Sequence, residues 1–238
     1  MLDLILKGGQ VISPWGIGNW DVGIKGEKIV SITEQESFAV EAARVIDVSG
    51  KLVMPGGIEP HTHCSTNILK GPNETREFYS SGPKEVGRAC LFGGTTTLVD
   101  FAYWRPGIDI FQSIEEKEQI FRPESYCDYS YHCHLVSQHT DGELPFSIME
   151  QVRDVIAAGF ATIKVFMTNT TPARRPNQIC DLGHIWEIMQ HVKEAGGSMA
   201  VHAEDEDIVM FMYRKLEYLD KYGSAYLHDA HNNLSEDI

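Results

Sequence analysis

Positive charge is scarce in this sequence. Its 238 residues include 20 Lys and Arg against 34 Asp and Glu, which gives a formal net charge of −14 at pH 7. Nucleic acids and anionic membrane surfaces are polyanions that repel so acidic a chain. No apolar run approaches the ~20 residues of a membrane-spanning helix, and the first residues lack the basic start of a signal peptide. We therefore expect no nucleic-acid partner and no membrane partner.

Regular cysteine spacing is missing as well. The five cysteines are odd in number and scattered, without a CxxC pair, and they are Cys64, Cys90, Cys127, Cys133 and Cys180. A disulfide framework or a zinc knuckle would need paired, closely spaced cysteines. The pattern predicts reduced thiols and a cytoplasmic protein.

Residues 1–54 have no helical period of useful length. An alternation of apolar residues starts at Leu2 and stops at Gly8-Gly9. A glycine turn at 25–28 joins two short apolar runs, which is a hairpin signal. We predict a small all-β module here, of the β-sandwich type.

From residue 55 the pattern changes to strand, loop and helix, repeated. Five apolar or β-rich runs predict strands that end at His63 or cover 95–102, 126–136, 162–167 and 198–204. Helix start signals separate these strands, among them Pro83 and the capping boxes Ser113-x-x-Glu116 and Ser147-x-x-Glu150. This order predicts a parallel sheet with helices outside it.

No Gly-x-Gly-x-x-Gly motif follows the first of these strands, which argues against a dinucleotide-binding fold. Polar residues at the C-terminal ends of several strands instead indicate a TIM-type (β/α)₈ barrel, which needs about 250 residues. Only 238 − 54 = 184 residues follow the β module. We predict an incomplete α/β barrel of about five strand–helix units at 55–238, and we expect residues 1–238 alone to be inactive.

Two histidines one residue apart end the first predicted barrel strand. His61 and His63 follow the break Pro55-Gly56-Gly57. Because side chains alternate along a strand, both imidazoles should point to the same side, where they can hold one metal ion. The pair alone is also compatible with two solvated histidines. Further candidate ligands on later strands favour the metal site.

Lys164 lies inside the otherwise apolar run 162–167. A buried lysine costs free energy unless it is paired or neutral. One interpretation is a salt bridge to a carboxylate such as Asp100. The other is a lysine of lowered pKa, whose free amine takes up carbon dioxide and becomes a carbamate. The two oxygens of a carbamate can bridge two metal ions.

Other polar residues close the remaining strands. His202 ends the fifth strand, and together with the other candidates it is better interpreted as a ligand than as a packed histidine. Imidazole and carbamate oxygen suit zinc. His132 and His134 form a second His-x-His pair, for which packing or support of a ligand ranks before direct ligation. Asp100 could orient a ligand.

The segments VMPGGIEPHTH, GGTTTLVDFA, DYSYH, IKVFM and VHAED together resemble the cyclic amidohydrolases, and within them the hydantoinase/dihydropyrimidinase group. The resemblance runs from residue 1 to about 210. It implies that His61 and His63 bind a first zinc ion, that carboxylated Lys164 bridges it to a second, and that His202 binds the second. The family's further histidine and its aspartate base are expected beyond residue 238, so the catalytic base is not assigned. His228 and His231 do not match that histidine's context.

Several positions depart from the family pattern. Glu59 replaces the usual Asp before Pro-His-Thr-His, and Cys64-Ser65-Thr66 argues against the dihydroorotase and allantoinase relatives. Asn169 stands where hydantoinases carry a substrate-contacting tyrosine, which makes it a candidate substrate contact and removes the phenol. Arg174 and Arg175 are either solvated or select an anionic side group of the substrate.

The resemblance implies a hydrolase that opens a small cyclic amide or imide such as hydantoin or dihydrouracil. Two zinc ions would turn a bridging water into hydroxide near neutral pH, and an aspartate would pass the proton to the leaving nitrogen. A homo-oligomer is expected for the full-length protein. Two alternatives stay open. One is a non-catalytic assembly protein on the same fold, and the other is a one-metal deaminase, which would not need the lysine of the fourth strand.

Overall fold

The computed structural model describes residues 1–68, 78–136, 138–139, 142–169 and 179–237. These residues divide into two compact units, Met1–Gly57 and Ile58–Ile238. The first unit is an all-β sheet, as the sequence predicts. Its strands are β1 (Leu2–Ser13), β2 (Gly16–Lys25), β3 (Lys28–Glu34), β4 (Ala42–Asp47) and β5 (Leu52–Val53). Their order is β3-β2-β1-β4, and β5 pairs with β1.

The sequence predicts that the first strand ends at Gly8-Gly9. In the structure this pair forms a bulge inside the strand instead. The register of β1 against β2 shifts between Leu6 and Gly9, and Gly8 has a φ of +86°. The buried Asp21 carboxylate accepts the Gly8 N–H at 2.8 Å. A glycine therefore bends the strand here without leaving its amide unpaired. The predicted glycine turn at 25–28 is confirmed.

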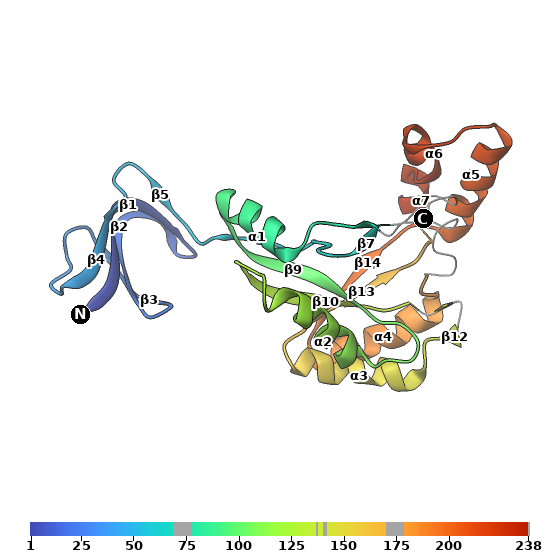
Figure 1. Cartoon of the computed structure of the whole chain (residues 1–238), viewed down its shortest axis with the longest axis horizontal. Coiled ribbons are helices and arrows are strands. Elements are labelled where there is room, and N and C mark those ends of the chain that lie inside the picture. The colour runs from blue at the N-terminus through green and yellow to red at the C-terminus, as the bar shows by residue number, and fades with distance from the viewer. Residues whose placement is uncertain (69–77, 137, 140–141, 170–178, 238) are drawn as a thin grey trace. The chain divides into compact units, whose positions relative to one another are not determined.

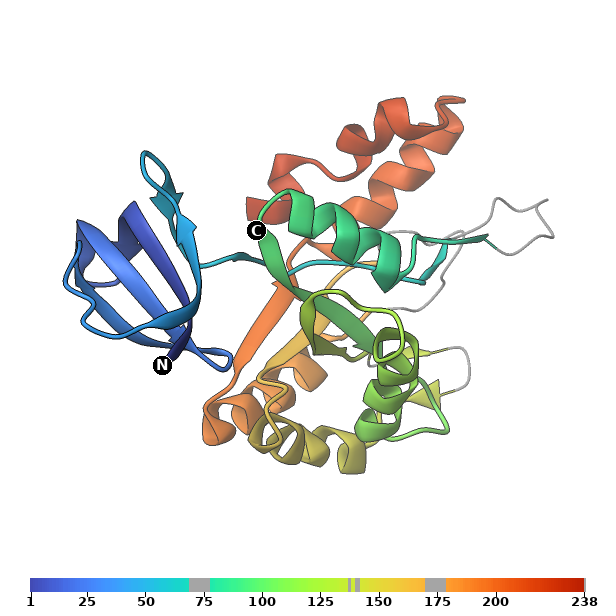
Figure 2. The same ribbon diagram turned by 60° about the vertical axis from the view of Figure 1, so that its left-hand side comes forward.

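The second unit is built on a parallel sheet of five strands in the order β14-β13-β10-β9-β6. These strands are β6 (Gly57–Glu59), β9 (Thr95–Tyr103), β10 (Asp128–His134), β13 (Thr162–Phe166) and β14 (Ser198–His202). They form a curled half-barrel, which confirms the predicted fold class (Figure 1 and Figure 2). Four two-residue strands form separate hairpins: β7 (Asn67–Ile68) with β8 (Phe78–Tyr79), and β11 (Gln138–His139) with β12 (Gly142–Glu143).

Helices connect the strands and complete the described chain. They are α1 (Pro83–Phe92), α2 (Ile110–Phe121), α3 (Phe146–Ala157), α4 (Leu182–Ala195), α5 (Glu206–Tyr218), a 3₁₀ turn (Ser224–Tyr226), α6 (Leu227–Ala230) and α7 (Asn233–Asp237). Figure 1 shows α2, α3 and α4 together on one side of the sheet. The main apolar core lies between these three helices and the strands.

Both predicted capping boxes lie inside helices rather than at their starts. Helix α2 begins after Asp109, whose carboxylate caps it, and the Ser113 hydroxyl donates to a carbonyl of the preceding turn at 2.7 Å. Helix α3 begins after Pro145, so Ser147 lies in its first turn. A serine hydroxyl that is satisfied within a helix does not need to cap it. The predicted helix start at Pro83 is confirmed, because α1 begins there.

The five-stranded sheet has two chemically different faces, because side chains alternate along each strand. The helix-covered face is apolar, with Leu98, Ala102, Cys133, Leu135, Ile163 and Val165 in the core. The strand register places a polar and aromatic set on the opposite, inner face: Phe101, Tyr103, His132, His134, Lys164, Phe166 and His202. Candidate ligands therefore share the face that the helices leave open.

The five cysteines all lie among the described residues and are free thiols, as predicted. No helix within the described ranges is long and apolar enough to cross a membrane.

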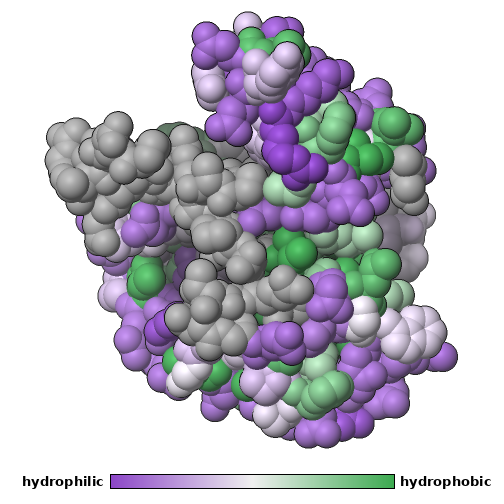
Figure 3. Space-filling model, turned by 90° about the vertical axis from the view of Figure 1, so that its right-hand side faces the viewer, coloured by the Kyte–Doolittle hydropathy of each residue, from purple (hydrophilic) through white to green (hydrophobic). Residues whose placement is uncertain are grey.

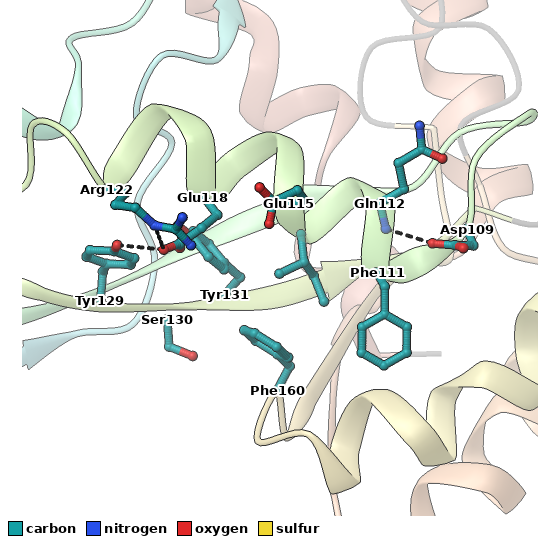
Figure 4. Close-up of a pocket in the computed structure, with 11 residues that line it drawn as sticks. Asp109, Phe111, Gln112, Glu115, Glu118, Arg122, Tyr129, Ser130, Tyr131 and Phe160 are labelled. Atoms are coloured by element: carbon teal, nitrogen blue, oxygen red, sulfur yellow. Dashed lines mark hydrogen bonds and ion pairs between the residues drawn. The ribbon is translucent and has the colours of Figure 1, made fainter.

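A cavity of about 800 Å³ lies on the outer side of the half-barrel, between α2 and β10. Figure 4 shows the carboxylate of Glu118 at its edge, beside Tyr129 and Tyr131. Their hydroxyls donate to this carboxylate at 2.9 and 3.0 Å, and Arg122 pairs with it at 3.1 Å. Partial burial opposes ionisation, but these hydrogen bonds outweigh it and lower the pKa of Glu118. The lining of this cavity includes none of the predicted site residues.

We expect Glu118→Gln to lower the free energy of unfolding by about 1 kcal/mol at pH 7, because it replaces a charged acceptor of several hydrogen bonds. A carboxylate with a depressed native pKa stabilises the fold above its unfolded pKa, and the effect is lost as the pH falls through the native pKa. The gap between variant and wild type should therefore narrow from pH 5 to pH 3. Urea denaturation measures it, with exposed Glu115→Gln as control. A gap independent of pH would contradict this assignment.

Candidate metal centre

The two histidines of the first motif lie just past the end of β6. The sequence predicts that this strand ends at His63, but it ends at Glu59. Pro60 has no amide N–H to continue the hydrogen bonds of the sheet. The chain nevertheless stays extended, because the Thr62 N–H donates to a carbonyl of β9 at 3.1 Å. Both imidazoles contact the Phe101 ring, at centroid distances of 4.8 and 4.9 Å. The predicted shared orientation is therefore confirmed.

The ring nitrogens of His61 and His63 face each other. Their Nε2 atoms are 3.2 Å apart, and two nitrogens bound to one tetrahedral zinc ion would be about 3.3 Å apart. His63 Nδ1 lies 2.8 Å from the Tyr103 hydroxyl, which fixes its ring. Desolvation, and then the charge of Lys164, lower the pKa of His61. The neutral imidazole that results is the form that binds metals.

Lys164 is buried in β13, in register with His134 of the neighbouring strand. Desolvation lowers the pKa of its amine. The interpretation as a salt bridge to Asp100 is wrong, because that carboxylate lies on the opposite face and pairs with Lys117 at 2.8 Å. Among the described residues, no carboxylate pairs with Lys164. Its amine instead lies 4.7 Å from the centroid of the Phe166 ring.

The buried Asp100–Lys117 pair holds the backbone that carries the two histidines. Asp100 Oδ2 accepts the Cys64 N–H at 2.6 Å and the Thr62 hydroxyl at 3.0 Å. Lys117 Nζ donates to the Cys64 carbonyl at 2.7 Å. Asp100 thus holds the segment that carries the two candidate ligands through its backbone and Thr62, not through the histidine rings. The sequence predicted the orienting role of Asp100 but not Lys117.

Aromatic rings and imidazoles form a continuous row along the inner face. The row runs through five rings, with centroid distances of 6.5, 5.2, 5.3 and 4.9 Å in the order His63, Tyr103, His134, Phe166 and His202. Beside this row, His132 Nε2 lies 2.8 Å from the Pro60 carbonyl. Packing and support of neighbouring ligands is the role that these contacts favour for His132 and His134.

His202 ends β14, as predicted, at the opposite edge of the sheet from His61. Its Nε2 lies 2.5 Å from Glu204 Oε2, and that carboxylate also meets His231 Nδ1 at 2.8 Å. Burial opposes ionisation of Glu204, but hydrogen bonds from the two imidazoles outweigh it and lower its pKa. The structure therefore brings His61, His63 and Lys164 together, and gives His202 separate partners that the sequence did not indicate.

The remaining predicted site residues are less informative. Asn169 is buried directly after β13, and its N–H donates to Glu206 at 2.7 Å. Its contact with substrate stays a prediction. Arg174 and Arg175 lie outside the described residues.

No family model matches the chain. A D-hydantoinase from Ralstonia pickettii is 32% identical over 214 residues, which are 90% of this chain and 42% of that protein. A dihydropyrimidinase from Rattus norvegicus is 29% identical over 167 residues, 70% of this chain and 29% of that protein. The crystal structure of a dihydropyrimidinase from Brevibacillus agri has a TM-score of 0.82 and 26% identity, and the match covers 99% of this chain and 47% of that chain.

The half-barrel with imidazoles at its strand ends is that of the cyclic amidohydrolases. More narrowly, the chain is a homologue of the hydantoinases and dihydropyrimidinases, as the resemblance of its motifs predicts. It spans about half the length of the relatives that it matches.

We expect Lys117→Met to lower the free energy of unfolding by about 3 kcal/mol or more, because it leaves the Asp100 charge buried without its counter-ion. Lys193→Met, at an exposed position of α4, is the matched control and should change little. Urea denaturation of both variants measures the difference. Equal stabilities would show that the pair does not hold this part of the fold.

Proposed function

We propose that this protein hydrolyses a ring C–N bond of a small cyclic amide or imide, of the hydantoin or dihydropyrimidine type. His61, His63, Lys164 and His202 would be the metal ligands that this chain contributes. One observation carries the proposal. Two imidazole nitrogens 3.2 Å apart share a sheet face with a buried lysine that has no carboxylate partner among the described residues.

The donor set fits zinc. The spacing of the His61 and His63 nitrogens agrees with tetrahedral coordination, and desolvation lowers the pKa of His61, which favours its neutral, ligating form. His202 keeps Nδ1 for a second ion, since its Nε2 is engaged by Glu204. When bound, two zinc ions supply a nucleophile from water near neutral pH and polarise the ring carbonyl.

Lys164 would connect the two ions as a carbamate. Desolvation favours the neutral amine, whose lone pair attacks carbon dioxide. The new N–C bond forms with loss of one proton to water, and the side chain becomes an anion with two oxygens. A lysine paired with a carboxylate would keep its proton and could not react, so the isolation of Lys164 from Asp100 supports this role.

The residues around the ligands position them. The Asp100–Lys117 pair fixes the backbone on both sides of Thr62, and Tyr103 fixes the His63 ring. The catalytic base is not assigned to any residue of this chain. A homo-oligomer and a cytoplasmic location stay predictions from the sequence.

Elemental analysis of the full-length protein should find about two zinc ions per chain. We expect His61→Ala and His202→Ala each to lower this content, because each removes a direct ligand. His228→Ala, an exposed histidine on α6, is the matched control. Unchanged zinc in both ligand variants would refute the site. A wild-type protein without zinc or ring-opening activity would favour the non-catalytic assembly protein.

Lys164→Ala should lower hydrolysis of dihydrouracil or hydantoin on the order of hundredfold or more, because the bridge between the ions is lost. Acetate or propionate should restore part of this activity by supplying the two oxygens. Activity assays with and without these acids measure the effect, and mass spectrometry of the native wild type should show the added carbon dioxide. Lys193→Ala serves as control. Normal activity of Lys164→Ala would point to the one-metal deaminase.

A further inference from the structure

Glu204 is the most enclosed acidic group beyond β14. Its side chain is 3% exposed, although it lies only two residues after the strand end. His202 Nε2 meets Oε2 at 2.5 Å, His231 Nδ1 meets Oε1 at 2.8 Å, and the Ser235 hydroxyl donates to Oε1 at 3.3 Å. One buried carboxylate thus gathers partners from the strand end, from the residue after α6 and from α7.

His231 is itself held at both ring nitrogens. Its Nδ1 faces Glu204, and its Nε2 lies 2.8 Å from the Tyr213 hydroxyl on α5. Its side chain is 15% exposed. Because the carboxylate accepts at Nδ1, the phenol donates to Nε2 when the ring is neutral. The four groups form one chain of hydrogen bonds from Tyr213 through His231 and Glu204 to His202.

The same residues could instead be three ligands of one cation, since donor atoms of His202, Glu204 and His231 all lie within 4.8 Å of one another. Two donors on one tetrahedral zinc ion would be about 3.3 Å apart. The observed contacts of 2.5 and 2.8 Å are hydrogen-bond distances. In addition, Tyr213 already occupies the far nitrogen of His231. The geometry favours a carboxylate shared by two imidazole N–H groups.

We propose that Glu204 and His231 are positioning residues for His202, an inference that rests on the proposed function. The Glu204 carboxylate accepts the Nε2–H of His202, and this selects the tautomer whose lone pair is on Nδ1. His231 and Ser235 hold the carboxylate in place, and Tyr213 holds His231. Carboxylates that accept the second N–H of a ligating histidine fix its ring and raise its basicity.

This arrangement makes the C-terminal helices part of the site's support. Helix α5 supplies Tyr213, and the Asp205 N–H donates to the Ser235 carbonyl at 2.7 Å, which ties the start of α5 to α7. Figure 3 shows the outer surface of this region, at the top of the view, as mostly hydrophilic.

The test uses zinc titration of the full-length protein against a competing chelator, with ¹⁵N-histidine NMR of the metal-free form. His202→Ala should remove one zinc equivalent. Glu204→Gln and His231→Gln should lower the affinity for that same zinc ion by about 10–100-fold, the usual cost of losing such support. The other equivalent should keep its affinity. In the wild type, the His202 ring should be the Nε2–H tautomer, and both variants should show a mixture. His228→Gln, three residues from His231, should match wild type in both measurements.

The outcomes separate the inference from the proposed function. If His202→Ala removes one zinc equivalent but His231→Gln and Glu204→Gln keep wild-type affinity and tautomer, the positioning role is wrong and the proposed function stands. If His231→Gln removes a whole equivalent and its Co²⁺ spectrum shows one nitrogen ligand fewer than that of the wild type, His231 is a direct ligand and the positioning role is wrong. If His202→Ala leaves zinc binding unchanged, both are wrong. Tyr213→Phe is a milder change, and its zinc affinity should lie between those of His231→Gln and the wild type.

Discussion

A buried ion pair behind the sheet determines where the candidate ligands lie. Asp100 is fully buried and receives the Lys117 ammonium, the Thr62 hydroxyl and the N–H groups of Cys64 and Phe101. Buried charges are tolerated when their hydrogen-bonding capacity is filled in this way. Because the side chain of Thr62 must face this carboxylate, its two neighbours in sequence must face the other side of the sheet. His61 and His63 thereby reach the inner face.

Two buried lysines in the same unit differ in whether a carboxylate compensates their charge. Lys117 has a carboxylate at 2.8 Å and a carbonyl at 2.7 Å, so its charge is compensated. Lys164 has no carboxylate partner among the described residues, its amine lies 4.7 Å from the centroid of the Phe166 ring, and desolvation lowers its pKa. The sheet separates them, since Asp100 and Lys164 project from opposite faces. One lysine therefore has its charge compensated, whereas burial favours the neutral amine of the other.

Most of the second unit could be predicted from sequence, because buried parallel strands are nearly continuous apolar runs and helices begin at recognisable caps. The order of the five strands along the chain and the end of the fifth at His202 follow from such runs. The interpretation of Lys164 as a partner of Asp100 was wrong because the strand register places the two side chains on opposite faces of the sheet. The sequence did contain a signal for Lys117. This lysine lies on the same helical stripe as Ile114 and Phe121, so it had to be buried and paired.

Other parts of the site have no local signal. Glu204 and His231 are 27 residues apart, and only the packing of α5, α6 and α7 brings them together. The capping box at Ser113 was wrong because the same four-residue pattern also fits a helix interior, where a serine bonds to the preceding turn. Ser147 lies in the first turn of α3, after the true start at Pro145. Sequence patterns therefore indicated the candidate ligands at the strand ends, whereas the groups that contact them required the tertiary structure.

Anomalous diffraction at the zinc edge tests the central claim most directly, using crystals of the full-length protein grown with zinc and bicarbonate. We expect one peak about 2.1 Å from the Nε2 atoms of His61 and His63. A second peak should lie at His202 Nδ1, with carbamate density on Lys164 between the two. A single peak among His202, Glu204 and His231, with none at His61 and His63, would contradict the account.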